Sequence, residues 1–167
     1  MEAIAGKTVE PCGLSKHDIH ALAEKFARRV RYAPGDDLEE LVRKLGGTVE
    51  IRDLAELGRS GSIQVHAPGR FTIFLPSYTG RLRDRFTIAH ELGHYVLHSR
   101  LGKHPIHVMR EGSGRTEWEA NWFAAAFLMP EGEFRRRLEA SQSDAEIALY
   151  FDVSPSAVEV RKKSLEG

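Results

Sequence analysis

Apolar residues recur every three or four positions in the first part of the chain, a spacing typical of amphipathic helices. Residues 15–31 form the first such stretch, and Ser15 with Asp18 three positions later resembles a capping box at its start. A second, shorter stretch covers residues 36–45 and stops at a pair of glycines. Both stretches are predicted to be scaffold helices.

The spacing of apolar residues then changes to the alternation expected of strands. Residues 48–51, 62–65 and 71–75 are rich in β-branched and aromatic side chains, and a turn sequence at 67–70 joins the last two. They predict a small, mostly antiparallel sheet packed on helices. Residues 100–115 hold several glycines, a proline and two histidines, so we expect a mobile loop there.

Between these regions lies the motif His90-Glu91-Leu92-Gly93-His94. Its flanks carry no proline and have apolar side chains at helical spacing, so the motif is expected in a helix. His90 and His94 are then one turn apart on one face, where both can bind a single metal ion. Glu91 is rotated by about 100° and lies beside that ion. It is the candidate general base for a water that the ion activates.

A catalytic zinc commonly has three protein ligands, so the motif predicts one more. His98 is not expected to supply it, because a continuous helix separates it from His90 by about 12 Å of rise; it would support or pack beside the site. Glu117 lies in the next helical stretch, one turn before Asn121, which can hydrogen-bond a ligand. Glu119 is displaced by about 200° from Glu117 around that helix and stays open as the alternative.

Two blocks of this sequence together resemble a known family. Residues 85–94 (RFTIAHELGH) and 117–130 (EWEANWFAAAFLMP), in this order and with the closing Leu-Met-Pro, are similar to the ImmA/IrrE family of zinc metallopeptidases. The similarity extends from about Leu38 to the C-terminal segment. It implies an α+β, zincin-like fold and a gluzincin-like endopeptidase. The metal ligands that it implies are His90, His94 and Glu117, with Glu91 as the catalytic carboxylate.

The resemblance also implies a partner, namely a helix-turn-helix transcriptional repressor or an antitoxin-like regulator that the enzyme cleaves. In zincins a sheet edge beside the metal helix commonly receives the substrate as an added strand, and the sequence leaves open which strand forms that edge. One alternative is a zinc-stabilised module that binds a repressor without cutting it, and Glu91 argues against this. The metal is expected to be one zinc ion, with manganese open.

Length and composition fit one soluble globular domain, since 167 residues with 41% hydrophobic and 29% charged content can bury a real core. We expect a single metallopeptidase domain over 1–167, with 15–130 as its core and 131–167 as a helical subdomain. The longest apolar run, 122–129, is too short to span a bilayer, and 1–7 lacks the features of a signal peptide.

The single cysteine, Cys12, excludes an internal disulfide and fits a reducing compartment, so a cytoplasmic location is expected. Cys12 is interpreted as an ordinary reduced thiol, with a thiolate that caps and inhibits the metal as the alternative. The formal net charge of zero gives no electrostatic reason to expect nucleic-acid binding.

The C-terminal segment predicts a helix-turn-helix-like arrangement. Ser143 and Glu146 form a capping box, and Ser154 followed by Pro155 marks the start of a last helix. Residues 131–167 hold six basic and eight acidic side chains, which opposes phosphate binding. We therefore interpret the segment as a packing or partner-docking module rather than a DNA-binding one.

Two further roles stay open at this stage. The arginines that precede the metal helix either solvate its start, which is the preferred interpretation, or attract an acidic substrate segment. These arginines are Arg81, Arg83 and Arg85. The side chains that could stabilise an oxyanion are Tyr78, Tyr95, His66, His104 and His107.

Overall fold

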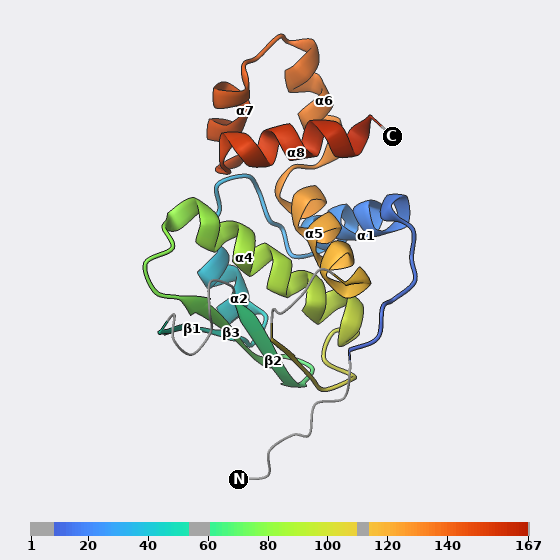
Figure 1. The fold of residues 1–167 in the computed structure, drawn as a ribbon, viewed down its shortest axis with the longest axis vertical. Coiled ribbons are helices and arrows are strands. Elements are labelled where there is room, and N and C mark those ends of the chain that lie inside the picture. Colours follow the sequence, from blue (N-terminus) through green and yellow to red (C-terminus); the bar gives the residue numbers. More distant parts are fainter. Residues whose placement is uncertain (1–8, 54–60, 110–113, 167) are drawn as a thin grey trace.

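The computed structural model describes residues 9–53, 61–109 and 114–166, and Figure 1 shows their arrangement. The helices are α1 (Lys16–Arg29), α2 (Leu38–Lys44), α4 (Arg81–Gly93), the π-helix η1 (His94–His98), α5 (Arg115–Leu128), α6 (Glu131–Glu139), α7 (Asp144–Phe151) and α8 (Pro155–Leu165). The strands are β1 (Thr48–Arg52), β2 (Ser62–Ala67), β3 (Arg70–Pro76) and β4 (Ile106–Met109). The expectation about a signal peptide at 1–7 and part of the predicted loop, 110–113, lie outside the described residues.

The fold is α+β, as the sequence predicts, and its described strands form one sheet in the order β1-β3-β2-β4. β2 pairs antiparallel with both β3 and β4, whereas β1 runs parallel to β3. The prediction of a loop over residues 100–115 is wrong at β4. Ile106 and Val108 are buried there and His107 between them is exposed, which is the alternation of a strand, but glycine and proline dominate the surrounding sequence.

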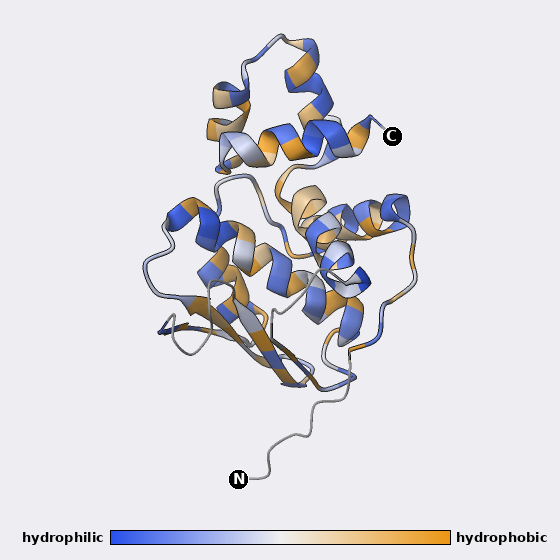
Figure 2. Ribbon diagram, viewed as in Figure 1, coloured by the Kyte–Doolittle hydropathy of each residue, from blue (hydrophilic) through white to orange (hydrophobic). Residues whose placement is uncertain are grey.

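Helices cover one face of this sheet (Figure 1). Phe71, Ile73 and Leu75 on β3 are buried, while Thr72 and Phe74 between them are partly exposed. The alternation follows from the period of two in a strand, and it makes the buried row part of the core. Figure 2 shows the same mixture of apolar and hydrophilic positions along the amphipathic helices. No helix in the described part of the chain is long and apolar enough to cross a membrane.

The close crossing of α4 and α5 determines where the functional side chains meet. A Cβ atom added to Gly93 would lie 3.1 Å from Phe123 Cβ and 3.2 Å from both Cα and the carbonyl oxygen of Ala120. Such distances are shorter than ordinary van der Waals contacts. The two helices therefore approach this closely because residue 93 has no side chain and residue 120 has a small one.

Helices α6 to α8 lie beyond the C-terminal end of α5 (Figure 1). The Ser143 capping box is confirmed, with hydrogen bonds in both directions between Ser143 and Glu146, and Ser154 caps α8 with Pro155 in its first turn. Arg161 on α8 is fully buried, donates through Nε to the carbonyl of Met129, and anchors α8 to the rest of the protein.

The arginines before the metal helix serve this same attachment. Arg81 makes a bidentate pair with the carboxylate of Asp152, the residue that ends α7. Arg85 is buried and donates to the carbonyl oxygens of Asp152 and Asp36 and to the hydroxyl of Tyr32. Solvation of the helix start is therefore wrong for the buried Arg85, whereas Arg81 pairs with Asp152 while its side chain stays 68% exposed, which is compatible with that role.

Candidate active site

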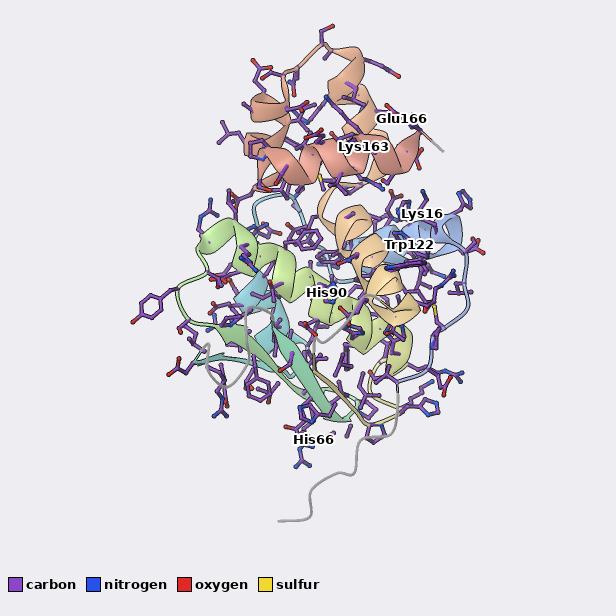
Figure 3. The ribbon with its side chains drawn as sticks, in the orientation of Figure 1. Lys16, His66, His90, Trp122, Lys163 and Glu166 are labelled. Carbon is purple, nitrogen blue, oxygen red and sulfur yellow. The ribbon has the colours of Figure 1, made fainter. Side chains whose placement is uncertain are left out.

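The motif residues lie where α4 changes into the π-helix η1. His90 and Glu91 are in the last turns of α4 and His94 is the first residue of η1. All three side chains are fully buried. Figure 3 shows His90 in the region where α4 faces α5. The predicted helix is thus present, although it is not a continuous α-helix.

Three side chains from two helical segments converge at this point. Nε2 of His90 lies 3.0 Å from Oε2 of Glu117, and Nε2 of His94 lies 3.0 Å from Oε1 of the same carboxylate. Glu117 comes from the first turn of α5, which the crossing at Gly93 holds against α4. The structure therefore brings together the three residues that the sequence singles out as metal ligands.

Asn121 determines which nitrogen of His90 carries a proton. His90 Nδ1 lies 2.7 Å from Asn121 Oδ1, and a carbonyl oxygen can only accept, so Nδ1 donates. A neutral ring then has only a lone pair on Nε2. This nitrogen is buried, faces the carboxylate of Glu117, and has no hydrogen-bond partner among the described residues. A cation between this nitrogen and the carboxylate would satisfy both acceptors, and two imidazoles with one carboxylate suit zinc.

The charge of Glu117 fits this arrangement. Burial raises the pKa of the carboxyl, but the neighbouring rings of His90 and His94 outweigh it and hold the pKa well below its ordinary value. Glu117 is therefore ionised and offers a negatively charged oxygen that could bind a cation together with the two rings.

Glu91 has the space it needs because the residue facing it is a glycine. A Cβ atom on Gly61 would lie 3.5 Å from Glu91 Oε1, 2.9 Å from the carbonyl oxygen of Phe74 and 2.5 Å from Thr87 Cγ2. Any larger residue at position 61 would press on the helix turn that carries Glu91. The sequence alone does not single out Gly61, since a glycine just before a strand is also an ordinary turn signal.

Comparison with known proteins identifies the family of this chain. The model of the Peptidase M78 family, described as the IrrE N-terminal-like domain, matches residues 42–163. The chain belongs to the Peptidase M78 family. Metallopeptidase ImmA of Bacillus subtilis (strain 168) is 30% identical over 115 residues, which cover 67% of this chain and 68% of that protein. The protein is therefore a metallopeptidase, the predicted family is confirmed, and the family implies a metal ion.

A solved structure of a Mycobacterium tuberculosis transcriptional regulator has a similar fold, with a TM-score of 0.59 and 22% sequence identity. The match covers 85% of this chain and 45% of that one, so the chain spans less than half the length of that protein. At this identity the likeness concerns the Peptidase M78 fold alone.

Glu119, the alternative ligand, faces away from the two motif histidines. Its carboxylate accepts hydrogen bonds from the backbone N–H of Cys12 at 2.9 Å, the backbone N–H of Gly13 at 3.2 Å and the Cys12 thiol at 2.6 Å. Nε2 of His98 lies 3.5 Å from it. Glu119 thus belongs to a second cluster, on the other side of the first turn of α5.

Cys12 does not belong to the group formed by His90, His94 and Glu117. Burial, together with its hydrogen bond to Glu119, raises the pKa of the Cys12 thiol to about 11, so the thiol keeps its proton. The hypothesis of an inhibitory thiolate cap is wrong for this structure, because the sulfur is directed to Glu119. His98 lies in the same cluster, where burial and neighbouring His94 lower its pKa to about 4, and the ring is neutral at pH 7.

The side chains considered for oxyanion stabilisation lie elsewhere. Tyr95 stacks on Phe71 with ring centroids 4.2 Å apart, and its hydroxyl accepts the N–H of Gly69, so Tyr95 is structural. Tyr78 is 99% exposed. Figure 3 shows His66 near the far end of β2, away from His90. The histidines of the predicted loop, His104 and His107, are exposed.

Proposed function

We propose that this metallopeptidase is a zinc-dependent endopeptidase in which Glu91 is the general base. The observation that carries the proposal is the convergence of His90, His94 and Glu117 on one point, with the buried Glu91 directly following His90 on the same helix. Zinc is proposed over manganese because manganese prefers oxygen ligands, whereas two of these three ligands are imidazoles.

The metal ligands and the general base would have separate roles. His90, His94 and Glu117 would hold the ion, and when bound it polarises the scissile carbonyl and lowers the pKa of water. Glu91 accepts the proton of the attacking water and later delivers it to the nitrogen of the leaving amine. Burial of Glu91 limits proton exchange with bulk water during this transfer.

The substrate would bind as an extended segment along β4. β4 and β1 are the outer strands of the described sheet, and β4 is the one that precedes α5, the helix that carries Glu117. Backbone hydrogen bonds to an outer strand hold an extended peptide largely irrespective of its side chains. From the family resemblance we propose a helix-turn-helix repressor or an antitoxin-like regulator as the substrate, and the cytoplasm as the place of cleavage.

Helices α6 to α8 are proposed to belong to the same metallopeptidase domain as the rest of the chain. Arg161 joins α8 to the end of α5, and Arg81 and Arg85 join α4 to the end of α7. These attachments support packing rather than DNA binding as the role of the C-terminal helices.

The test compares wild-type protein with Glu91→Gln and Glu117→Gln. Each is loaded with zinc and incubated with the helix-turn-helix regulator encoded beside its gene; bound zinc is measured by elemental analysis and fragments by mass spectrometry. Glu91→Gln should keep one zinc and cut at least about 100-fold more slowly, whereas Glu117→Gln should lose both zinc and cleavage. Undiminished cleavage by Glu91→Gln would refute the general base. Binding of the regulator by wild-type protein without any fragments would favour a non-cleaving module.

A further inference from the structure

Behind His94, on the side away from Glu117, a series of buried polar groups leads to the N-terminal segment. His94 Nδ1 lies 2.8 Å from His98 Nδ1, and His98 Nε2 lies 3.5 Å from Glu119 Oε1. His94 and Glu119 are fully buried and His98 is 8% exposed. We call the series His94, His98 and Glu119 the outer network.

The π-helix η1 carries His98 four residues after His94. Its widened turn is marked by the hydrogen bond from the backbone N–H of Ser99 to the carbonyl oxygen of His94, five residues earlier. The two imidazole rings are tilted by 45° with centroids 4.9 Å apart, and their Nδ1 atoms face each other. Single-turn π-helices occur frequently at functional sites.

The positions of the ring protons determine which group donates and which accepts in each hydrogen bond of the outer network. If His94 binds a cation through Nε2, the one proton of its neutral ring is on Nδ1, which donates to His98 Nδ1. His98 then carries its own proton on Nε2, the atom that faces the Glu119 carboxylate. The opposite arrangement would place the His94 proton on Nε2, where it would prevent metal binding.

The N-terminal segment completes the outer network. Glu119 receives the backbone N–H groups of Cys12 and Gly13 and the thiol of Cys12, and Arg115 on α5 donates to the carbonyl of Leu14. These bonds fix both carboxylate oxygens. The docked segment thereby orients the carboxylate that faces His98.

We propose that His98 and Glu119 are positioning residues that fix the tautomer and ring orientation of the metal ligand His94, and that docking of the segment around Cys12 strengthens metal binding through them. The inference rests on the metal site of the proposed function. It makes the affinity for the ion depend on residues that do not touch it, as is common for carboxylate–histidine–metal arrangements.

A second metal ion in the cluster of Cys12, His98 and Glu119 is the competing interpretation. Their potential ligand atoms lie within 4.8 Å of one another, beside a cavity of about 500 Å³ lined in part by Cys12 and His98. However, the 2.6 Å separation of sulfur and carboxylate is that of a hydrogen bond, whereas two ligand atoms on one tetrahedral zinc lie about 3.5 Å apart. In addition, a single proton lies between the Nδ1 atoms of His94 and His98, so one of the two neutral rings carries its own proton on Nε2. The Nε2 atoms of both rings therefore cannot bind metal ions at the same time.

The test measures zinc affinity by competition with a chelator, and the d–d absorption of the cobalt(II)-loaded protein. His98→Phe removes the acceptor for His94 Nδ1 and should weaken zinc binding by roughly 10- to 100-fold and shift the cobalt spectrum. His98→Asn places an amide oxygen near the former Nδ1 and should regain most of the affinity. Glu119→Gln should weaken binding several-fold. Ser99→Ala is the matched control, since it removes a buried side-chain hydrogen bond in the same turn without touching the His94 ring.

The outcomes separate this inference from the proposed function. If wild-type protein binds no zinc, the metal site itself fails. If wild-type protein binds one zinc and His98→Phe binds it equally tightly, or His98→Asn stays as weak as His98→Phe, the positioning role is wrong. Should His98→Phe fail to fold, the His98→Asn and Glu119→Gln affinities decide. Two zinc ions per wild-type chain would establish the competing interpretation.

Discussion

The substitution Gly93→Ala tests the close approach of α4 and α5 directly. The new methyl group would meet Phe123 Cβ at 3.1 Å and backbone atoms of Ala120 at 3.2 Å. None of these atoms can rotate away, because two belong to the backbone of α5 and the third is the first atom of its side chain. Ordinary carbon contacts are about 3.5–4.0 Å, so the helices must separate by roughly half an ångström.

Two opposing terms set the size of the effect on stability. Overpacking of a tight contact costs about 1–3 kcal/mol, while replacing glycine by alanine inside a helix gains about 1 kcal/mol. We expect a net decrease of up to about 2 kcal/mol in the free energy of unfolding. The separation also moves Glu117 away from His90 and His94, and metal sites tolerate deviations of only about 0.2 Å. Zinc affinity should therefore fall at least about tenfold.

Urea unfolding of the metal-free protein and chelator competition for zinc measure the two effects separately. Gly132→Ala is the matched control, because a Cβ there meets nothing within 4 Å and the residue lies in α6, away from the site. It should leave zinc affinity unchanged and stabilise the protein by up to about 1 kcal/mol. Equal stability and equal zinc affinity of Gly93→Ala and wild-type protein would show that the missing side chain does not set the helix spacing.

Three further predictions follow from single contacts. Asn121→Ala removes the acceptor at His90 Nδ1 and should weaken zinc binding by roughly 10- to 100-fold in chelator competition, with Asn121→Asp close to wild type. Removal of the metal by a chelator should lower the melting temperature, since zinc at 1,000 times its Kd stabilises the fold by about 4 kcal/mol; an unchanged melting temperature would argue against the site. Burial and, to a smaller extent, the charge of Arg161 lower the pKa of His20 from 6.5 to about 4. Below pH 6.5 the unfolded chain therefore binds a proton that the folded protein does not bind. The free energy of unfolding should therefore fall as the pH is lowered from 6.5 to 4. The decrease is at most about 3 kcal/mol, and it is smaller where water reaches the ring. His20→Gln should flatten this loss in urea midpoints compared at pH 7 and pH 4.5, and an equally steep loss would contradict it.

The features that could be predicted from the sequence are those fixed by neighbours within about one helical turn. Ser15 caps α1 by accepting the N–H of Asp18, and Ser143 and Glu146 bond each other at the start of α7, as their spacing indicates. The pairing of Asn121 with a motif histidine was also accessible, because Glu117 and Asn121 lie one turn apart.

The features that could not be predicted depend on contacts between distant parts of the chain or on small departures from ideal geometry. The hydrogen bonds between Cys12 and Glu119 join residues 107 positions apart, and no local pattern indicates them. The π-helix requires a hydrogen bond over five residues instead of four, and apolar spacing does not distinguish the two over so short a segment. An α-helix would also bring His98 near His94, four residues earlier, so the pattern could indicate a supporting role for His98 but not the pairing of the two Nδ1 atoms.

The choice between Glu117 and Glu119 shows how one local rule has a consequence that only the tertiary structure reveals. The displacement of about 200° around the helix was a reason to accept one carboxylate and set the other aside. In the folded protein both are buried and the same displacement places them on different sides of His94: Glu117 faces its Nε2, and Glu119 reaches its Nδ1 side through His98. A neutral imidazole has one nitrogen that binds a cation and one that donates a proton, so each needs a different kind of partner. The first turn of α5 provides both, which explains why a second carboxylate is buried so close to the one that would bind the metal.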